Sequence, residues 1–256
     1  MKNKITYTIV LVVAAITSAN AQGGKPEDTE VWTPIPKTVT TGKPYVDPPS
    51  DAIILFGGTS LDKWVSAQNR EQPAMWTVHD GVFTVKKETG NIETKQMFTN
   101  YQLHIEWQVP SNITGEGQGR GNSGVFLASL GKGDAGYELQ VMDSYNNKTY
   151  VNGMAGSIYK QAIPLANPAK KPGEWQTYDV VWMAPTFNDD STVKTPAKVT
   201  AFFNGVLVEN NFELWGPTRY IGKTSYQQHG PSPIKLQAHG DKSEPISFRN
   251  IWIREL

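Results

Sequence analysis

The segment YQLHIEWQV, from Tyr101 to Val109, decides the fold class because its side chains alternate in character. Apolar Ile105 and Trp107 alternate with polar His104 and Glu106. A period of two is typical of a strand that turns one face to a core and the other to solvent. We therefore expect Ile105 and Trp107 to be buried between two layers.

Short runs of the same kind lie on both sides of this segment, separated by Gly, Asn, Asp and Pro. They predict strands at 76–78, 82–86, 124–128, 137–142, 177–183, 198–203, 206–209, 234–238 and 246–254. Asn204-Gly205, between two of these runs, is a strong signal for a tight hairpin. No segment keeps a helical period over three turns, which favours an all-β sandwich of two antiparallel sheets, with Leu139 and Leu236 also in its core.

The first residues have the pattern of a cleavable signal peptide spanning 1–21. Lys2 and Lys4 precede an apolar run, and Ala19-Asn20-Ala21 is a small-residue cleavage site. The apolar run, Ile9 to Ile16, is shorter than the roughly 20 residues of a membrane span. The chain has no cysteine, which excludes a lipid-anchored cysteine and disulfides. We expect a periplasmic or extracellular protein without membrane insertion.

Residues 22–50 differ from the rest in composition. They contain six prolines and almost no apolar periodicity, which predicts an extended arm or linker and not a packed element. Residues 51–256 have a length that one sandwich can occupy, so we expect one catalytic or sugar-binding domain there.

Charge and composition limit the classes of partner. The formal net charge is zero and no block of Lys or Arg stands out, which excludes the basic footprint of a nucleic-acid or anionic-membrane binder. Eight Trp, ten Tyr and nine Phe make the chain rich in aromatic rings. Most such rings belong to the core of a sandwich, but an exposed ring can stack on a sugar. A neutral ligand such as a carbohydrate fits best.

Polar side chains that can do chemistry lie on two of the predicted strands. Glu138 and Gln140 share one face of their strand, whereas Asp143 is out of phase unless a bulge intervenes. Near the carboxyl end, Lys235, Gln237 and His239 alternate with apolar or small residues and share one face. A polar stripe of this kind also fits a plain solvent-facing strand.

A third candidate is the glycine-flanked turn Gly121-Asn122-Ser123-Gly124, which leads into a strand. It fits an ordinary tight turn as well as a ligand-binding one.

A series of short motifs runs in order from Asp51 to the end of the chain. It comprises FGG-x-SLDKW (56–64), W-x-V-x-DGVF (76–83), GNSGVF (121–126), YELQVMD (137–143), GSIY (156–159), PGEWQ (172–176), LQAHG (236–240) and FRNIWI (248–253). As a set it resembles the 3-keto-disaccharide hydrolase family, formerly a domain of unknown function. The resemblance implies a concanavalin-like jelly roll that holds a sugar on its concave sheet. The chain departs from the family's pattern by insertions around 112–120 and 187–195 and by PGEWQ in place of PGEWN.

The chemistry that the resemblance implies is cleavage of 3-keto-glycosides. A ketone at carbon 3 acidifies the hydrogen at carbon 2, so a base can remove it and the group on carbon 1 can leave. His239 suits the base or the acid, and Glu138 suits the base or a residue that orients the histidine. Arg249 and Lys235 are candidates to stabilise the enolate. Arg249 also fits a structural residue that anchors the last strand.

We expect these residues to converge on one polar site. The predicted cluster consists of Glu138, Gln140, Lys235, Gln237, His239 and Arg249, with Asn122 and Tyr159 as further substrate-binding candidates.

Two other functions fit the same fold. A laminarinase-like glycoside hydrolase would use Glu138 and Asp143 as its pair of carboxyl groups. A non-catalytic carbohydrate-binding module would need neither. A divalent cation stays open as a cofactor, because Glu138, Asp143, Asp189 and Asp190 offer oxygen ligands, although acidic residues on loops also fit solvated surface.

Overall fold

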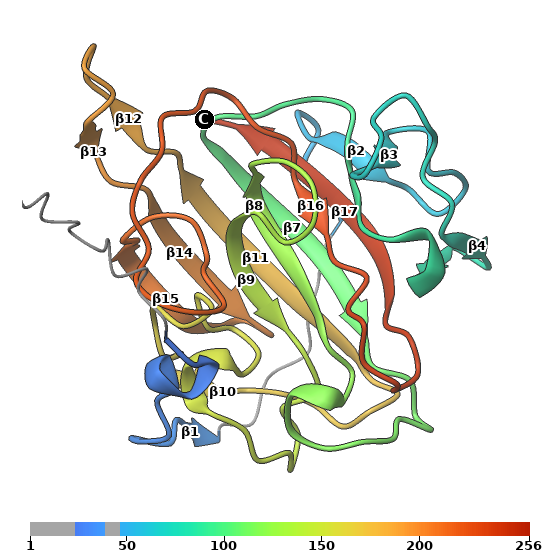
Figure 1. Ribbon diagram of the computed structural model, residues 1–256. Helices are drawn as coiled ribbons and strands as arrows, with labels where there is room; N and C mark the ends of the chain where they lie inside the picture. Colours follow the sequence, from blue (N-terminus) through green and yellow to red (C-terminus); the bar gives the residue numbers. More distant parts are fainter. Residues whose placement is uncertain (1–23, 39–46) are drawn as a thin grey trace, which may run out of the picture.

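The structure, a computed structural model, describes residues 24–38 and 47–256, and its body is built around two facing β-sheets (Figure 1). Helix is limited in these residues to four short 3-10 turns, Pro26–Thr29, Lys87–Thr89, Gly117–Gly119 and Val151–Gly153. The predicted all-β sandwich is confirmed. The predicted signal peptide at 1–21 lies outside the described residues. In the part of the chain that is described, no helix has the length and apolarity to cross a bilayer.

The larger sheet has eight strands. In spatial order they are β15 (Val206–Glu213), β14 (Lys198–Phe203), β11 (Trp175–Met183), β7 (Tyr101–Gln108), β17 (Ser247–Glu255), β5 (Val82–Thr84) and β4 (Thr77–His79), with β2 (Ile53–Phe56) also paired to β17. Strand β7, where the alternation is strongest, lies between β11 and β17 and pairs antiparallel with both. Asn204 and Gly205 both have positive φ, 52° and 77°, as the predicted tight hairpin between β14 and β15 requires.

The smaller sheet has five strands and carries the candidate site. Its order is β3 (Trp64–Ser66), β6 (Ile92–Thr94), β16 (Lys235–Leu236), β8 (Ser123–Ser129) and β9 (Gly136–Val141). In Figure 1, β8, β9 and β16 lie in front of the long strands β7, β11 and β17. Strands β2, β3 and β6 were not predicted, because three or four residues are too few to show a period. The predicted insertion near 187–195 forms a small hairpin of β12 (Thr186–Phe187) and β13 (Val193–Thr195).

The space between the sheets is filled by the apolar phase of their strands. Ile105 and Trp107 from β7, Leu139 from β9 and Leu236 from β16 each expose at most 1 % of their surface, so the predicted core phase is confirmed. The ring of Trp107 stacks on Phe203 at a centroid distance of 5.7 Å. Because the apolar side chains of β9 and β16 point inward, their polar side chains lie on the outer face of the smaller sheet.

The proline-rich arm packs on the body of the protein. Strand β1 (Lys37–Thr38) pairs in parallel with β10 (Ala166–Asn167). The side-chain amide of Asn152 donates to the carbonyl of Thr29 and accepts from the amide of Val31, both at 3.0 Å. Only Pro36 of residues 26–38 is buried, so the arm is extended and mostly exposed, and these hydrogen bonds fasten it to the body. These contacts use backbone groups of the arm, which every residue has, so they need no apolar pattern and leave no signal in the sequence.

Candidate functional site

A polar cavity of about 150 Å³ opens on the outer face of the five-stranded sheet. Strand β9 and the chain after β16 meet there with four connecting segments, around residues 118–122, 134, 159 and 218–220. Its lining residues are Gln118, Asn122, Asp134, Glu138, Gln140, Tyr159, Thr218, Tyr220, Gln237 and His239.

Glu138 lines this cavity and is buried, with only 5 % of its surface exposed. Its carboxyl lies over Gly124 of the neighbouring strand, where a Cβ would stand 2.5 Å from Glu138 Oε1. Burial, reinforced by the negative charge of Asp134 and opposed by Lys235, raises the pKa of Glu138 to about 8. Glu138 is therefore a protonated acid at neutral pH and can donate a proton to a ligand.

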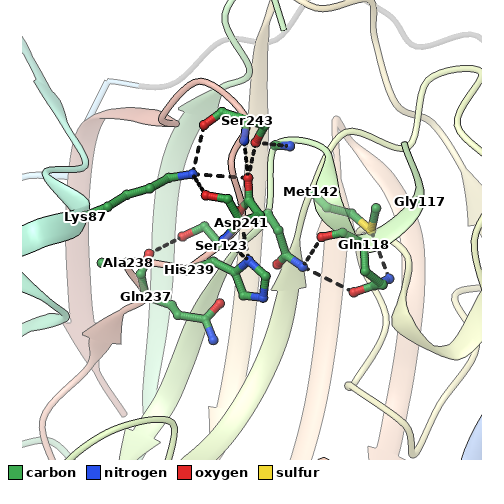
Figure 2. A network of polar contacts seen from close by, with 12 residues as sticks. Lys87, Gly117, Gln118, Ser123, Met142, Gln237, Ala238, His239, Asp241 and Ser243 are labelled. Atoms are coloured by element: carbon green, nitrogen blue, oxygen red, sulfur yellow. Dashed lines mark hydrogen bonds and ion pairs between the residues drawn. The ribbon is translucent and has the colours of Figure 1, made fainter. Parts of the chain in front are cut away.

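His239 is held by a buried carboxylate, Asp241 (Figure 2). Its Nδ1 lies 2.8 Å from Asp241 Oδ2, and Asp241 also accepts hydrogen bonds from Ser243 and from Lys87 Nζ. Although burial alone would raise the pKa of Asp241, these donors together lower it well below its usual range. An ionised carboxylate can only accept, so the 2.8 Å contact requires the proton on Nδ1 and outweighs the longer 3.3 Å approach of the Asp241 amide; the neutral imidazole then carries its lone pair on Nε2. His239 thus has the arrangement of an oriented base.

Amide side chains form the rest of the polar wall. Gln118 Nε2 donates to the carbonyl of Gly153 at 2.7 Å, and Asn122 Nδ2 donates to the carbonyl of Gln118 at 2.9 Å. Gln140 Nε2 donates in turn to Asn122 Oδ1 at 3.1 Å. The Oε1 atoms of Gln140 and Gln237 are buried and have no partner among the described residues. Such acceptors match the hydroxyl groups of a sugar.

The structure brings together six of the residues expected at the site: Asn122, Glu138, Gln140, Tyr159, Gln237 and His239. The convergence of Glu138 with His239, from strands about a hundred residues apart, follows because Phe126 of β8 pairs both with Glu138 and with Lys235. The Tyr159 hydroxyl lies 2.6 Å from that of Tyr150. The roles assigned to these residues stay predictions.

Lys235 shares the predicted face but does not reach the cavity. It is fully buried, and its Nζ donates to the carbonyls of Gly131, Gly133 and Ala135 at 2.6 to 2.9 Å. Burial lowers its pKa to about 8, against the raising effect of the nearby carboxylates. The expectation that Lys235 lines the sugar site is wrong. Its side chain is bonded to loop 131–135, which carries Asp134, and is buried beneath that loop.

Arg249 lies on β17 of the other sheet, so its predicted convergence with the site is also wrong. Its Nε donates to Glu106 Oε2 at 2.6 Å, and its guanidinium lies 4.0 Å from the ring centroid of Trp175. Alternation identifies the face of a strand but not the sheet to which the strand belongs. These contacts match the structural alternative, an anchor for the last strand.

Asp143 is buried beside the cavity without lining it. Its carboxylate accepts from Arg120 Nε at 2.6 Å and from the amide of Tyr145 at 3.0 Å. The pairing of Glu138 with Asp143 across a sugar bond therefore lacks support in the geometry.

The four cation candidates are not gathered into one centre. Asp189 and Asp190 lie on the loop of the β12–β13 hairpin, and Asp190 bonds to Thr192 of the same loop. Within residues 24–38 and 47–256, no group of three or more His, Cys, Asp or Glu side chains could hold a metal ion.

Sequence reasoning missed five residues of the site: Gln118, Asp134, Thr218, Tyr220 and Asp241. All five lie in connecting segments that have no period. Only Asp241 had a usable signal, since it follows His239 by two residues and a turn can bring the two side chains together.

Comparison with known families identifies the chain. Residues 51–254 match the model of the 3-keto-alpha-glucoside-1,2-lyase-like domain. The chain belongs to this family. The resemblance found in the sequence is thereby confirmed, and the protein is carbohydrate-active. No curated protein matches the chain.

Solved structures agree with this membership. A proposed glycosyl hydrolase from Parabacteroides distasonis is 53 % identical, with 90 % of this chain and 96 % of that chain covered at a TM-score of 0.78. A second proposed glycosyl hydrolase from the same organism is 18 % identical, covers 80 % and 94 % and has a TM-score of 0.59. The second likeness shows the fold alone.

Proposed function

We propose that this family member is an enzyme that cleaves 3-keto-glucosides by elimination across carbons 1 and 2. The observation that carries the proposal is the pairing, in one small polar cavity, of an imidazole oriented by Asp241 with the protonated carboxyl of Glu138. An oriented base and a protonated acid in one site are what an elimination needs.

The proposed reaction starts with His239 Nε2, which takes the proton from carbon 2. The electrons of that C–H bond move toward the ketone and form an enolate. When the ketone re-forms, a double bond appears between carbons 1 and 2 and the bond from carbon 1 to the leaving oxygen breaks. Glu138 gives its proton to that oxygen. Water added across the double bond then completes a net hydrolysis, with one proton taken and one proton given.

The amide side chains bind the sugar and its developing charge. Gln140 and Gln237 offer buried, unpartnered Oε1 acceptors to sugar hydroxyls. Gln237 lines the cavity, and its side-chain Nε2 is the donor we assign to the enolate oxygen.

A second candidate is ordinary glycoside hydrolysis by two carboxyl groups, Glu138 and Asp134. The observation that favours it is that Asp134 lines the same cavity and contributes to the raised pKa of Glu138. This mechanism would not need a ketone at carbon 3.

One experiment separates the candidates. The mature protein is offered a methyl 3-keto-glucoside, the plain methyl glucoside and a β-glucan, each with and without a chelator. Release of methanol from the keto substrate alone supports the elimination. Cleavage of a plain substrate supports the carboxyl pair, and tight binding without any cleavage would leave a carbohydrate-binding module as the better account.

We also propose that the protein is exported to the periplasm or beyond, on the basis of the signal-peptide pattern at residues 1–21. Sequencing the amino terminus of protein recovered from the periplasm and the medium tests this. A first residue of Gln22 is expected.

A further inference from the structure

A second and larger cavity, of about 580 Å³, lies beside the polar one. Tyr159 lines both cavities. Thr218 and Tyr220 line the polar cavity, and Arg219 between them lines the larger one. The two cavities therefore adjoin at Tyr159.

The larger cavity differs in chemical character from its neighbour. Its wall includes Val31, Ile163, Tyr159 and Trp215, and it contains no carboxylate and no histidine. The ring of Trp215 exposes a large surface, since 60 % of this residue is accessible to solvent. A cavity of this size with apolar and aromatic walls suits a small organic group. The proposed acid and base, Glu138 and His239, line the neighbouring polar cavity.

We propose that the larger cavity receives the leaving group of the substrate and selects flat, aromatic leaving groups by stacking on Trp215. This inference rests on the proposed function and adds its substrate class: 3-keto-glucosides of aromatic alcohols or phenols. The charged residues of the wall, Lys160, Arg219 and Lys223, are all cations, which disfavours a cationic leaving group.

The amino-terminal arm completes this cavity. Thr29 and Val31 of the arm form part of its wall. Asn152 holds both through their backbone groups, and the amide of Val151 donates to the carbonyl of Val31 at 2.6 Å. Lys160 Nζ adds a bond to the carbonyl of Pro26 at 2.8 Å. The arm is therefore tied to the body at the point where it lines the cavity.

The test compares methyl and benzyl 3-keto-glucosides of one anomer, because methanol and benzyl alcohol are leaving groups of similar acidity. The wild-type protein is expected to prefer the benzyl substrate in kcat/KM. Trp215→Ala is expected to reduce that preference by about tenfold, the value of one good aromatic contact. Phe202→Ala, which removes a partly exposed ring from β14, serves as the matched control and should leave the preference intact.

Calorimetric binding of the same two compounds to His239→Ala protein, which lacks the proposed base, provides a readout that does not depend on catalysis. Tighter binding of the benzyl compound, lost when Trp215→Ala is added, supports the cavity even if neither compound is a substrate of the wild type. Equal affinities and equal kcat/KM values for the two compounds would overturn the proposal, whether or not the keto-sugar is a substrate. A preference that persists unchanged in Trp215→Ala would also overturn it.

Discussion

The two sheets each carry a histidine bonded through Nδ1 to an aspartate, at nearly the same distance. His104 Nδ1 lies 2.7 Å from Asp179 Oδ1 on the eight-stranded sheet, and His239 Nδ1 lies 2.8 Å from Asp241 Oδ2 beside the five-stranded sheet. His239 lines the polar cavity, whereas the side chain of His104 is completely buried.

The surroundings of the two rings differ in access and in charge. The side chain of His104 is completely buried and stacks on Trp252 at 5.3 Å, with Glu106 Oε1 3.7 Å from its Nε2. The side chain of His239 is 34 % exposed, whereas its partner Asp241 is the buried member of the pair. The same bonded pair can therefore lie inside the fold in one place and present its second ring nitrogen to a cavity in another. Access to the second ring nitrogen decides which.

The largest effect is expected from His239→Ala. It should lower kcat/KM for a methyl 3-keto-glucoside about a hundredfold or more, because it removes a positioned base. The melting temperature should change little, since His239 lies at the rim of a solvent-reachable cavity. His104→Gln is the control at the other pair and should keep most of the activity. Full activity in His239→Ala would end the assignment of His239 as the base.

Glu138→Gln should lower kcat/KM by about a hundredfold, since an amide cannot supply the proton. The pH profile gives a second readout. With a pKa of about 8, Glu138 is protonated below that pH, so wild-type kcat/KM should fall as pH rises through about 8.

Glu209→Gln is the matched control for this change, because burial also raises the pKa of Glu209, to about 9, but Glu209 does not line the cavity. Its activity and its pH profile should stay as in the wild type. If the alkaline limb is lost in Glu209→Gln and kept in Glu138→Gln, the acid has been assigned to the wrong residue.

Gly124→Ala should lower kcat/KM about tenfold by moving an intact catalytic group. The added methyl would lie 2.5 Å from Glu138 Oε1, so the carboxyl must shift. Misplacement of this kind costs less than removal of the group but more than a surface change. Gly230→Ala meets nothing within 4 Å and is the control. Wild-type kinetics in Gly124→Ala would show that the position of Glu138 is not critical.

The smallest expected effect is on the free energy of unfolding, through the His104–Asp179 pair. Burial would lower the pKa of His104, but Asp179 and Glu106 outweigh it and raise the pKa. A raised folded-state pKa stabilises the fold below the unfolded value and loses this contribution as pH rises through the folded value. His104→Gln should therefore reduce the free energy of unfolding by about 1–3 kcal/mol at acidic pH and by less at alkaline pH. Denaturant titrations at both pH values measure the difference, and a larger loss at alkaline pH would contradict this sign.

Much of the fold and part of the site could be predicted from strand period alone. The alternation in β7 and β9 assigns Trp107 and Leu139 to the core and Glu138 to the outer face, as the structure confirms. The strand period carries no information about loops, so it could not predict that Asp241 belongs to the site or that loop 131–135 buries Lys235. Nor does it say which sheet a strand joins, and this is why Arg249 was misplaced.

The measurement that tests the central claim most directly is cleavage of a 3-keto-glucoside in D₂O. The released 3-keto sugar is analysed at early times by mass spectrometry and proton NMR. Elimination and hydration through His239 predict deuterium at carbon 2 of the product, above the level in a sample of product incubated without enzyme. A product that keeps its original hydrogen at carbon 2 would contradict the account and would favour direct hydrolysis by Glu138 and Asp134.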